Sequence, residues 1–124
     1  EEYLRKKGAT ILCLAGIYGP QRDPVSWLYK GLIQNPKKII NLIHLDDIVF
    51  VIKQLINKPQ PGERFNLSDG EARIWQDIGE KVGFEFRMPG MRDLSKIIDN
   101  SKICTMLPAD YQFKDLYSSC QLKN

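Results

Sequence analysis

Two stretches of this sequence carry side chains whose types and spacing could do chemistry. In the first, the single histidine, His44, stands just before Asp46 and Asp47. A histidine near a carboxylate is typical of a general base. A histidine in a strand can also be held in place by a fixed hydrogen bond, and aspartates that open a helix stabilise its free N–H groups. The sequence alone favours the structural interpretation of His44 over the catalytic one.

The second stretch, residues 16–22, contains two glycines, Tyr18 and Arg22. Glycine lets a ligand approach the backbone closely, and an arginine can bind a carboxylate or a phosphate. The alternative is a tight turn before a helix. Neither a G-x-G-x-x-G nor a G-x-x-x-x-G-K sequence occurs in residues 1–124, so neither common phosphate-binding loop is expected here.

Metal chemistry is not expected from this composition. The three cysteines, Cys13, Cys104 and Cys120, are scattered without a C-x-x-C spacing, and there is only one histidine. This pattern predicts neither a zinc site nor a disulfide framework. It favours a reducing, intracellular compartment, either the cytoplasm or an organelle stroma.

The elements that would position these residues alternate between strand and helix. An opening helix should end at Lys7, before Gly8 as its C-terminal cap. Apolar runs then predict strands over residues 10–17, 39–45 and 64–67, with a short alternating strand over 84–87. Helical spacing predicts helices over residues 24–34, 47–57 and about 68–82. This order is typical of an α/β sheet with helices packed on it.

Several details of these elements can be stated in advance. The strand over residues 10–17 is apolar on both faces, which predicts a parallel strand buried on both sides. Apolar residues surround most of the helix over 47–57, which predicts that it is buried. Asp23 and Pro24 should begin one helix, and Asp46 should cap the next. On that basis the substitution Asp46→Ala should destabilise the fold by roughly 0.5–2 kcal/mol.

After residue 87 the pattern loosens. We expect a turn-rich loop over residues 88–91, partial helix over 93–107 and a last helix over 113–120. The predicted organisation is therefore a first part, residues 1–87, and a mixed loop and helix tail, residues 88–124. Four short strands would leave a half-built sheet with a bare apolar edge, which suggests that the sequence is a fragment.

Size and charge narrow the class of function. The chain has 124 residues, of which 43% are hydrophobic and 27% are charged. These are ordinary globular values. The net charge of +3 is too small to indicate nucleic-acid binding, and the longest mainly apolar run, residues 9–17, is too short to span a membrane.

Three segments resemble successive landmarks of a known family. They are TILCLAGIYGPQR (10–22), INLIHLDDI (40–48) and RFNLSDGE (64–71). In order and spacing they are similar to the NAD-dependent epimerase/dehydratase group of extended and atypical short-chain dehydrogenases/reductases, over about residues 1–87. Cys13 stands where that family usually has an arginine, and Gln21 where it usually has a glycine.

The resemblance implies the C-terminal part of a Rossmann-like, mostly parallel sheet with flanking helices, followed by a small mixed substrate-side tail. It implies NAD or NADP as the cofactor. It also assigns a nicotinamide-side wall and a substrate-side wall. The first is formed by Ala15, Gly16 and Ile17, and the second by Tyr18, Arg22, Asn41 and His44.

The family's catalytic Tyr-x-x-x-Lys pair is expected upstream of residue 1, so no catalytic residue is assigned in this chain. Tyr3 and Lys7 match the spacing literally, but Lys7 stands at a helix end only three residues before a strand. The implied function is hydride transfer on a nucleotide sugar or a similar hydroxyl or carbonyl substrate. The alternative is a non-catalytic, dinucleotide-sensing or protein-binding scaffold of the same fold.

The partners implied are a small-molecule substrate, the missing N-terminal half of the same fold and, as an open option, a second copy of the chain as a homodimer. Nucleic acid and membrane are not expected as partners.

Overall fold

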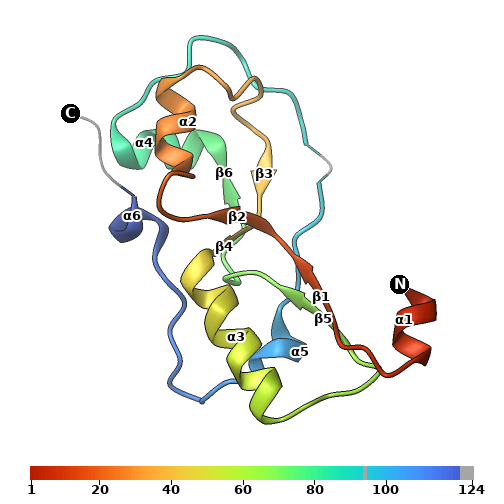
Figure 1. Ribbon diagram of the computed structural model, residues 1–124. Helices are drawn as coiled ribbons and strands as arrows, with labels where there is room; N and C mark the ends of the chain where they lie inside the picture. The colour runs from red at the N-terminus through yellow and green to blue at the C-terminus, as the bar shows by residue number, and fades with distance from the viewer. Residues whose placement is uncertain (94, 121–124) are drawn as a thin grey trace.

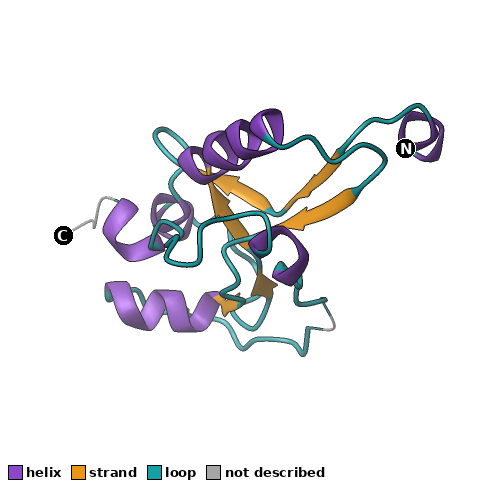
Figure 2. Cartoon of the chain, turned by 90° about the horizontal axis from the view of Figure 1, so that it is seen from below, coloured by secondary structure: helices purple, strands orange, loops and turns teal. Residues whose placement is uncertain are grey.

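The computed structural model describes residues 1–93 and 95–120 of the chain. The helices are α1 (Glu2–Lys6), α2 (Pro24–Tyr29), α3 (Leu45–Asn57), α4 (Trp75–Val82), α5 (Ser101–Cys104) and α6 (Leu116–Ser119). The strands are β1 (Ile11–Leu14), β2 (Gly16–Tyr18), β3 (Ile39–Ile40), β4 (Leu42–His44), β5 (Arg64–Leu67) and β6 (Arg73–Ile74). Helices lie on both sides of the strands (Figure 2). The α/β class and the mostly parallel strands predicted from the sequence are confirmed.

The predicted strand over residues 10–17 is one extended run that changes its partner midway. β1 pairs in parallel with β5, and β2 pairs in parallel with β4. The change occurs at Ala15 and Gly16, whose N–H groups donate to Leu67 and to Asn41 respectively. β4 therefore lies between β2 and the segment that follows β5. On the side away from β2, the carbonyl of Leu42 in β4 accepts a hydrogen bond from the N–H of Asp69. Figure 1 shows β1 and β2 as successive arrows.

The expectation that these strands form one regular sheet needs correction. They make three two-stranded ladders, β1–β5, β2–β4 and the antiparallel β3–β6. The predicted strand over 39–45 is interrupted at Asn41 and ends at His44, because α3 already begins at Leu45. β1 is also less buried than predicted, since Leu14 is 42% exposed.

Two helices differ from their predicted lengths for visible backbone reasons. α2 was expected to reach residue 34 but ends at Tyr29, and Gly31 then adopts a φ of +72°, which is incompatible with helix. The helix expected from about residue 68 begins only at Trp75. Residues before it are taken by β6, which pairs with β3.

The strand predicted over residues 84–87 is wrong. The N–H of Phe84 donates to the carbonyl of Gly79 at the end of α4. The ring of Phe84 then packs edge-on against Tyr29 and Phe86. The alternating aromatic residues thus cover α2 and α4 rather than extend the sheet.

Two apolar cores lie on either side of the strands. The first gathers Tyr18, Val25, Leu28, Leu42, Trp75, Ile78, Leu116 and Cys120. The second gathers Ala15, Ile43, Ile48, Val51, Phe65, Leu67 and Ile103. The predicted tail supplies a fully buried side chain to each core, Leu116 to the first and Ile103 to the second. The predicted helices at 93–107 and 113–120 are short, α5 and α6, and Leu94 lies outside the described residues.

The outer face of α3 departs from the prediction that this helix is buried. Val51 is fully buried, but one stripe along the helix is 42–70% exposed, and it consists of Leu45, Val49, Ile52 and Ile56. The stripe follows the helical spacing of one face. The prediction that α3 is buried on all faces is therefore wrong for this face, although its residues are apolar. No helix of the described residues is long and apolar enough to cross a membrane.

Candidate functional site

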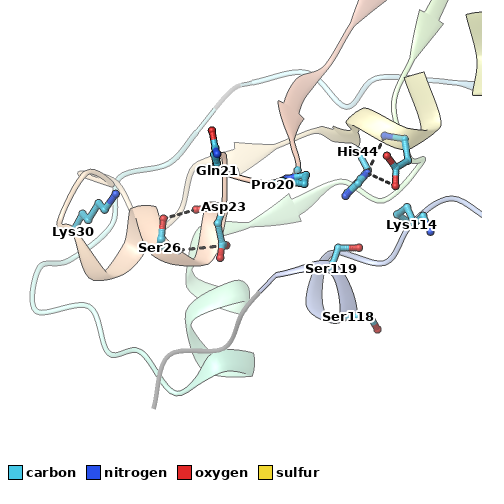
Figure 3. Close-up of a pocket in the computed structure, with 11 residues that line it drawn as sticks. Pro20, Gln21, Asp23, Ser26, Lys30, His44, Lys114, Ser118 and Ser119 are labelled. Atoms are coloured by element: carbon cyan, nitrogen blue, oxygen red, sulfur yellow. Dashed lines mark hydrogen bonds and ion pairs between the residues drawn. The ribbon is translucent and has the colours of Figure 1, made fainter. Parts of the chain in front are cut away.

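A cavity opens where β2 and β4 end, at Tyr18 and His44, which are paired in register. In open α/β sheets, ligands bind outside the carboxyl ends of parallel strands. The cavity has a volume of about 740 Å³. It is lined by Gly19, Pro20, Gln21, Asp23, Ser26, Lys30, His44, Asp46, Lys114, Ser118 and Ser119. Figure 3 shows that these side chains come from the loop after β2, from α2, from the start of α3, from α6 and from the segment leading into α6.

His44 is the site residue that the cavity holds most directly. Its Nδ1 accepts a hydrogen bond of 2.9 Å from the N–H of Asp46, so the side chain is the N-cap of α3. The Asp46 carboxylate lies farther from Nδ1, at 3.8 Å. Because Nδ1 accepts, the ring proton belongs on Nε2. In this arrangement His44 offers an N–H donor to the cavity.

This geometry corrects the cap predicted for α3. The cap is His44, not Asp46, whose side chain is 66% exposed. The carboxylate of Asp47 is buried instead and accepts hydrogen bonds from the hydroxyl of Tyr111 and from the N–H of Lys114. Of the two aspartates in the first turn of α3, the buried one, Asp47, therefore binds another segment of the chain.

Tyr18 lies beside the cavity but is not one of its lining residues. It is 1% exposed, and its ring packs edge-on against His44 with a centroid distance of 5.0 Å. Its hydroxyl donates to the carbonyl of Lys114 at 3.4 Å. Burial raises the pKa of the phenol well above its usual 10.0, so it remains a donor at neutral pH.

Arg22 and Asn41 are not cavity-lining residues either. The Nε of the exposed Arg22 donates to the carbonyl of Ile17 at 3.3 Å. The amide of Asn41 donates to Lys96 and accepts from the N–H of Ile98, which ties the tail to the end of β3. A role for either residue in substrate binding stays a prediction.

The predicted nicotinamide-side wall, residues 15–17, lies in the strand that leads to the cavity. Ala15 is 8% exposed, Gly16 is exposed, and Ile17 is half-buried. A Cβ at Gly16 would lie 3.2 Å from the carbonyl oxygen of Asn41, so a larger residue would require a backbone shift of a few tenths of an ångström. The N–H groups of Ala15 and Gly16 are already used by neighbouring strands. This wall therefore offers surface contact but no free backbone donors at those two residues.

Gln21 stands in the loop where the family pattern has a glycine. Its φ is +69°, the left-handed region that ordinary side chains avoid. The loop therefore has a backbone conformation typical of glycine at a glutamine, at a cost of roughly 1–2 kcal/mol. The isolated bridge between Gly19 and Arg22 closes the turn.

The resemblance implied a substrate-side tail, but none of the tail residues that line the cavity was assigned from the sequence. Lys114, Ser118 and Ser119 follow His44 by seventy residues or more, and no local pattern links them to it. Asp115 caps α6 by accepting from the N–H of Ser118 at 3.0 Å, which places these two serines.

A second cavity, of about 580 Å³, lies on the other side of the same tail segment and also includes Lys114. Its charged centre is an ion pair of 2.9 Å between Arg73 and Asp69, both largely buried. Burial raises the pKa of Asp69, although the ion pair opposes this effect. Within residues 1–93 and 95–120, no group of three histidine, cysteine or acidic side chains is placed to hold a metal ion.

The chain matches no protein-family model. It is 30% identical over 112 residues to Protein YeeZ of Escherichia coli K12, and the match covers 85% of this chain and 41% of YeeZ. The chain therefore spans well under half the length of this relative.

Two solved structures share the fold. A dTDP-glucose 4,6-dehydratase from Bacillus anthracis in complex with NAD is 17% identical, with a TM-score of 0.59 over 89% of this chain and 41% of that chain. The enzyme WbmG of Bordetella bronchiseptica in complex with NAD and UDP is 18% identical, with a TM-score of 0.62 over 90% of this chain and 43% of that chain. The resemblance inferred from the sequence is confirmed at the level of the fold, which matches the C-terminal region of these Rossmann-like proteins.

Proposed function

We propose that this chain forms the substrate-binding part of an NAD- or NADP-dependent epimerase, dehydratase or reductase that acts on a nucleotide sugar or a similar hydroxyl or carbonyl substrate. The single observation that carries the proposal is the cavity at the ends of β2 and β4, with the Nε2–H of His44 available to it. Similarity of the fold to proteins solved with NAD, in one case together with UDP, supports it.

The residues present fit only the nicotinamide end of such a cofactor. A dinucleotide's phosphates need free N–H groups at a helix start after a glycine-rich turn. Here the first N–H groups of α2 are already used, since Val25 and Ser26 donate to the Asp23 carboxylate. The N–H of Asp46 at the start of α3 likewise donates to His44. The cofactor's glycine motif and the catalytic tyrosine and lysine would belong to another part of the protein.

In the proposed enzyme, a bound nicotinamide would supply the hydride transfer. This chain's residues bind and orient the substrate. The Nε2–H of His44 would donate to a substrate oxygen. The hydroxyl of Ser119 adds a neutral hydrogen-bonding group to the cavity, whereas that of Ser118 already donates to Asp115. The cavity would let a sugar group enter while its reacting carbon faces residues 15–17.

Calorimetric titration of the chain with UDP-glucose, NAD and NADP tests the proposal. UDP-glucose should bind, whereas both dinucleotides should bind only in the millimolar range or weaker, about −4 kcal/mol. The chain alone should show no dehydrogenase activity. His44→Asn is the informative variant because asparagine can still cap α3 but lacks Nε2–H. It should weaken UDP-glucose binding by about tenfold. It should also lower stability, because it removes a buried ring that packs on Tyr18, so binding is compared at a temperature where both proteins are folded.

The alternative, a non-catalytic sensor of dinucleotides, predicts that the chain binds dinucleotides tightly and does not bind UDP-glucose. Micromolar binding of NAD or NADP by residues 1–124, with UDP-glucose ignored, would replace our proposal by that one.

A further inference from the structure

One wall of the cavity is a segment that crosses the start of α3, here called the strap and defined as residues 111–119. It contributes Lys114, Ser118 and Ser119 to the cavity. In Figure 3, Lys114 lies on the same side as His44, and the two serines lie below it. The inference that follows concerns the strap and rests on the proposed function of this cavity.

Both backbone polar atoms of Lys114 are held by buried side chains from other elements. Its N–H donates to the Asp47 carboxylate at 3.0 Å, and its carbonyl accepts from the Tyr18 hydroxyl at 3.4 Å. Asp47 and Tyr18 are each 1% exposed. A buried carboxylate is retained only when its oxygens are well partnered, so its use on a strap backbone fixes that segment firmly.

Tyr111 anchors the strap a second time. Its hydroxyl donates to the other oxygen of Asp47, and its ring stacks on Phe50 of α3 at a centroid distance of 4.4 Å. Burial and the neighbouring carboxylate raise the pKa of this phenol above its usual 10.0, so the hydroxyl keeps its proton. The two anchors lie on either side of Gln112 and Phe113, and together they set the position of Lys114.

The side chain of Lys114, in contrast, is exposed, and the residue lines this cavity as well as the second one. Among the residues that the structure describes, no carboxylate lies within 4.0 Å of its ammonium group, since the ion pairs involve other cations. The cavity's other lysine, Lys30, likewise has no ion-pair partner among the described residues, but its backbone only ends α2 and is not held by buried side chains. Of the two carboxylates that line the cavity, Asp23 caps α2, and Asp46 is exposed. An ammonium held on a fixed backbone and left without a counter-ion is suited to bind an anion.

We propose that Lys114 binds an anionic oxygen group of the substrate, a phosphate or a carboxylate, beside His44. Asp47 and Tyr18 are positioning residues that act through the backbone of Lys114. A lysine on a free loop would lose side-chain and backbone freedom when it binds. The backbone of Lys114 is already ordered in the folded chain, so binding of an anion need not order it.

Titration with inorganic pyrophosphate and with malonate, followed by amide NMR shifts, tests the role of Lys114. The shifted amides should be those of Gly19, Lys114 and Ser118, and the stronger of the two anions identifies the phosphate or carboxylate preference. Lys114→Met should weaken binding of that anion by about tenfold. Lys114→Arg should restore most of it. Lys58→Met, at the far end of α3, removes the same charge from an exposed site and should change nothing.

A double-mutant cycle tests the positioning residues. Asp47→Asn and Tyr18→Phe should each weaken anion binding severalfold in the parent chain, but neither should weaken it further in the Lys114→Met background. A merely structural role would lower affinity by the same factor in both backgrounds. Tyr18→Phe keeps the buried ring, so it provides this readout even if Asp47→Asn fails to fold.

The inference fails if neither anion shifts these amides, if the shifts centre on other lysines, or if Lys114→Met binds as well as the parent chain. Its failure is separable from that of the proposed function. UDP-glucose binding that depends on His44 but not on Lys114 would remove the inference and leave the proposal standing. Pyrophosphate binding that depends on Lys114, without any UDP-glucose binding, would do the reverse.

Discussion

The N-terminal end of α3 and its outer face differ in how their side chains are partnered. At its N-terminal end the polar groups are partnered: His44 accepts from the N–H of Asp46, and Asp47 accepts from the strap. Along its outer face the apolar stripe is open to solvent, and Ile56 is 70% exposed. The helix that looked uniformly apolar in sequence therefore has one end that positions a cavity and one face that is about half open to solvent.

This contrast shows which substitutions should matter. A substitution should lower the free energy of unfolding when the residue is buried or hydrogen-bonded within the chain. It should have little effect when the side chain is exposed to solvent. Hydropathy alone ranks these positions wrongly, since Asp47 is polar and fully buried, whereas Ile56 is apolar and exposed.

Asp47→Ala should have the largest effect, a loss of about 3 kcal/mol in the free energy of unfolding. The variant leaves the hydroxyl of Tyr111 and the N–H of Lys114 without their acceptor. Loss of a hydrogen-bond partner costs about 1–3 kcal/mol for a buried polar group, and these two groups are part-buried. Denaturant melts at neutral pH measure the difference.

Asp46→Ala is the matched control, one residue away on the exposed side. The side chain that caps α3 is His44 and not Asp46. This variant should therefore stay within about 0.5 kcal/mol of the parent. The result would revise the loss of roughly 0.5–2 kcal/mol that the sequence led us to expect. Equal losses for the two variants would mean that the carboxylates act only through the helix dipole.

Along the helix, Val51 and Ile56 compare a fully buried site with an exposed one. Val51→Ala should cost about 2 kcal/mol, since it removes two methyl groups from the core. Ile56→Ala removes more apolar volume, but from the surface, and it should cost less than about 0.5 kcal/mol. The same melts decide the order. A larger loss for Ile56 would show that the outer face is covered in solution, and light scattering would reveal whether a second copy of the chain covers it.

On the cavity side, Asp115 provides the cap of α6, so Asp115→Ala should cost about 1 kcal/mol. Hydrogen bonding from the N–H and hydroxyl of Ser118 lowers the pKa of this carboxyl below its usual 3.8. The carboxylate's contribution should therefore be complete above that usual value and be lost as the pH falls through the lowered one. The gap between parent and variant should close on acidification, and a pH-independent gap would contradict the assignment.

Gln21→Gly should have an effect of the opposite sign, a gain of about 0.5–1 kcal/mol. The backbone at this position has a φ of +69°. Glycine accepts such a positive φ without strain, although it loses more freedom on folding. Thermal melts measure the gain. A loss would mean that the Gln21 side chain makes a stabilising contact that offsets the backbone strain.

Sequence patterns predicted the elements whose signals are local. The bounds of β5 and the end of α3 at Asn57 agree with prediction, as does the cap of α2 by Asp23. Each depends on residues within a few positions of one another. The resemblance to the epimerase/dehydratase group was likewise carried by contiguous segments, and the fold bears it out.

What could not be predicted depends on contacts between distant segments. The hydroxyl of Tyr111 reaches Asp47 across 64 positions, and the carbonyl of Lys114 reaches Tyr18 across 96. For that reason Asp47 looked like a simple helix-start residue, and the strap did not look like part of the site. The exposed stripe on α3 was missed for a related reason, because helical periodicity shows which residues share a face but not what covers that face.

The strand β4 joins the two apolar cores through a pair of adjacent residues. Leu42 and Ile43 are both fully buried, yet Leu42 belongs to the first core and Ile43 to the second. Opening either core would pull β4 away from β2 and expose the neighbouring residue to water. The two halves of the chain should therefore unfold as one cooperative unit, in which the slowest-exchanging amide protons lie in β2 and β4 and not in one core alone.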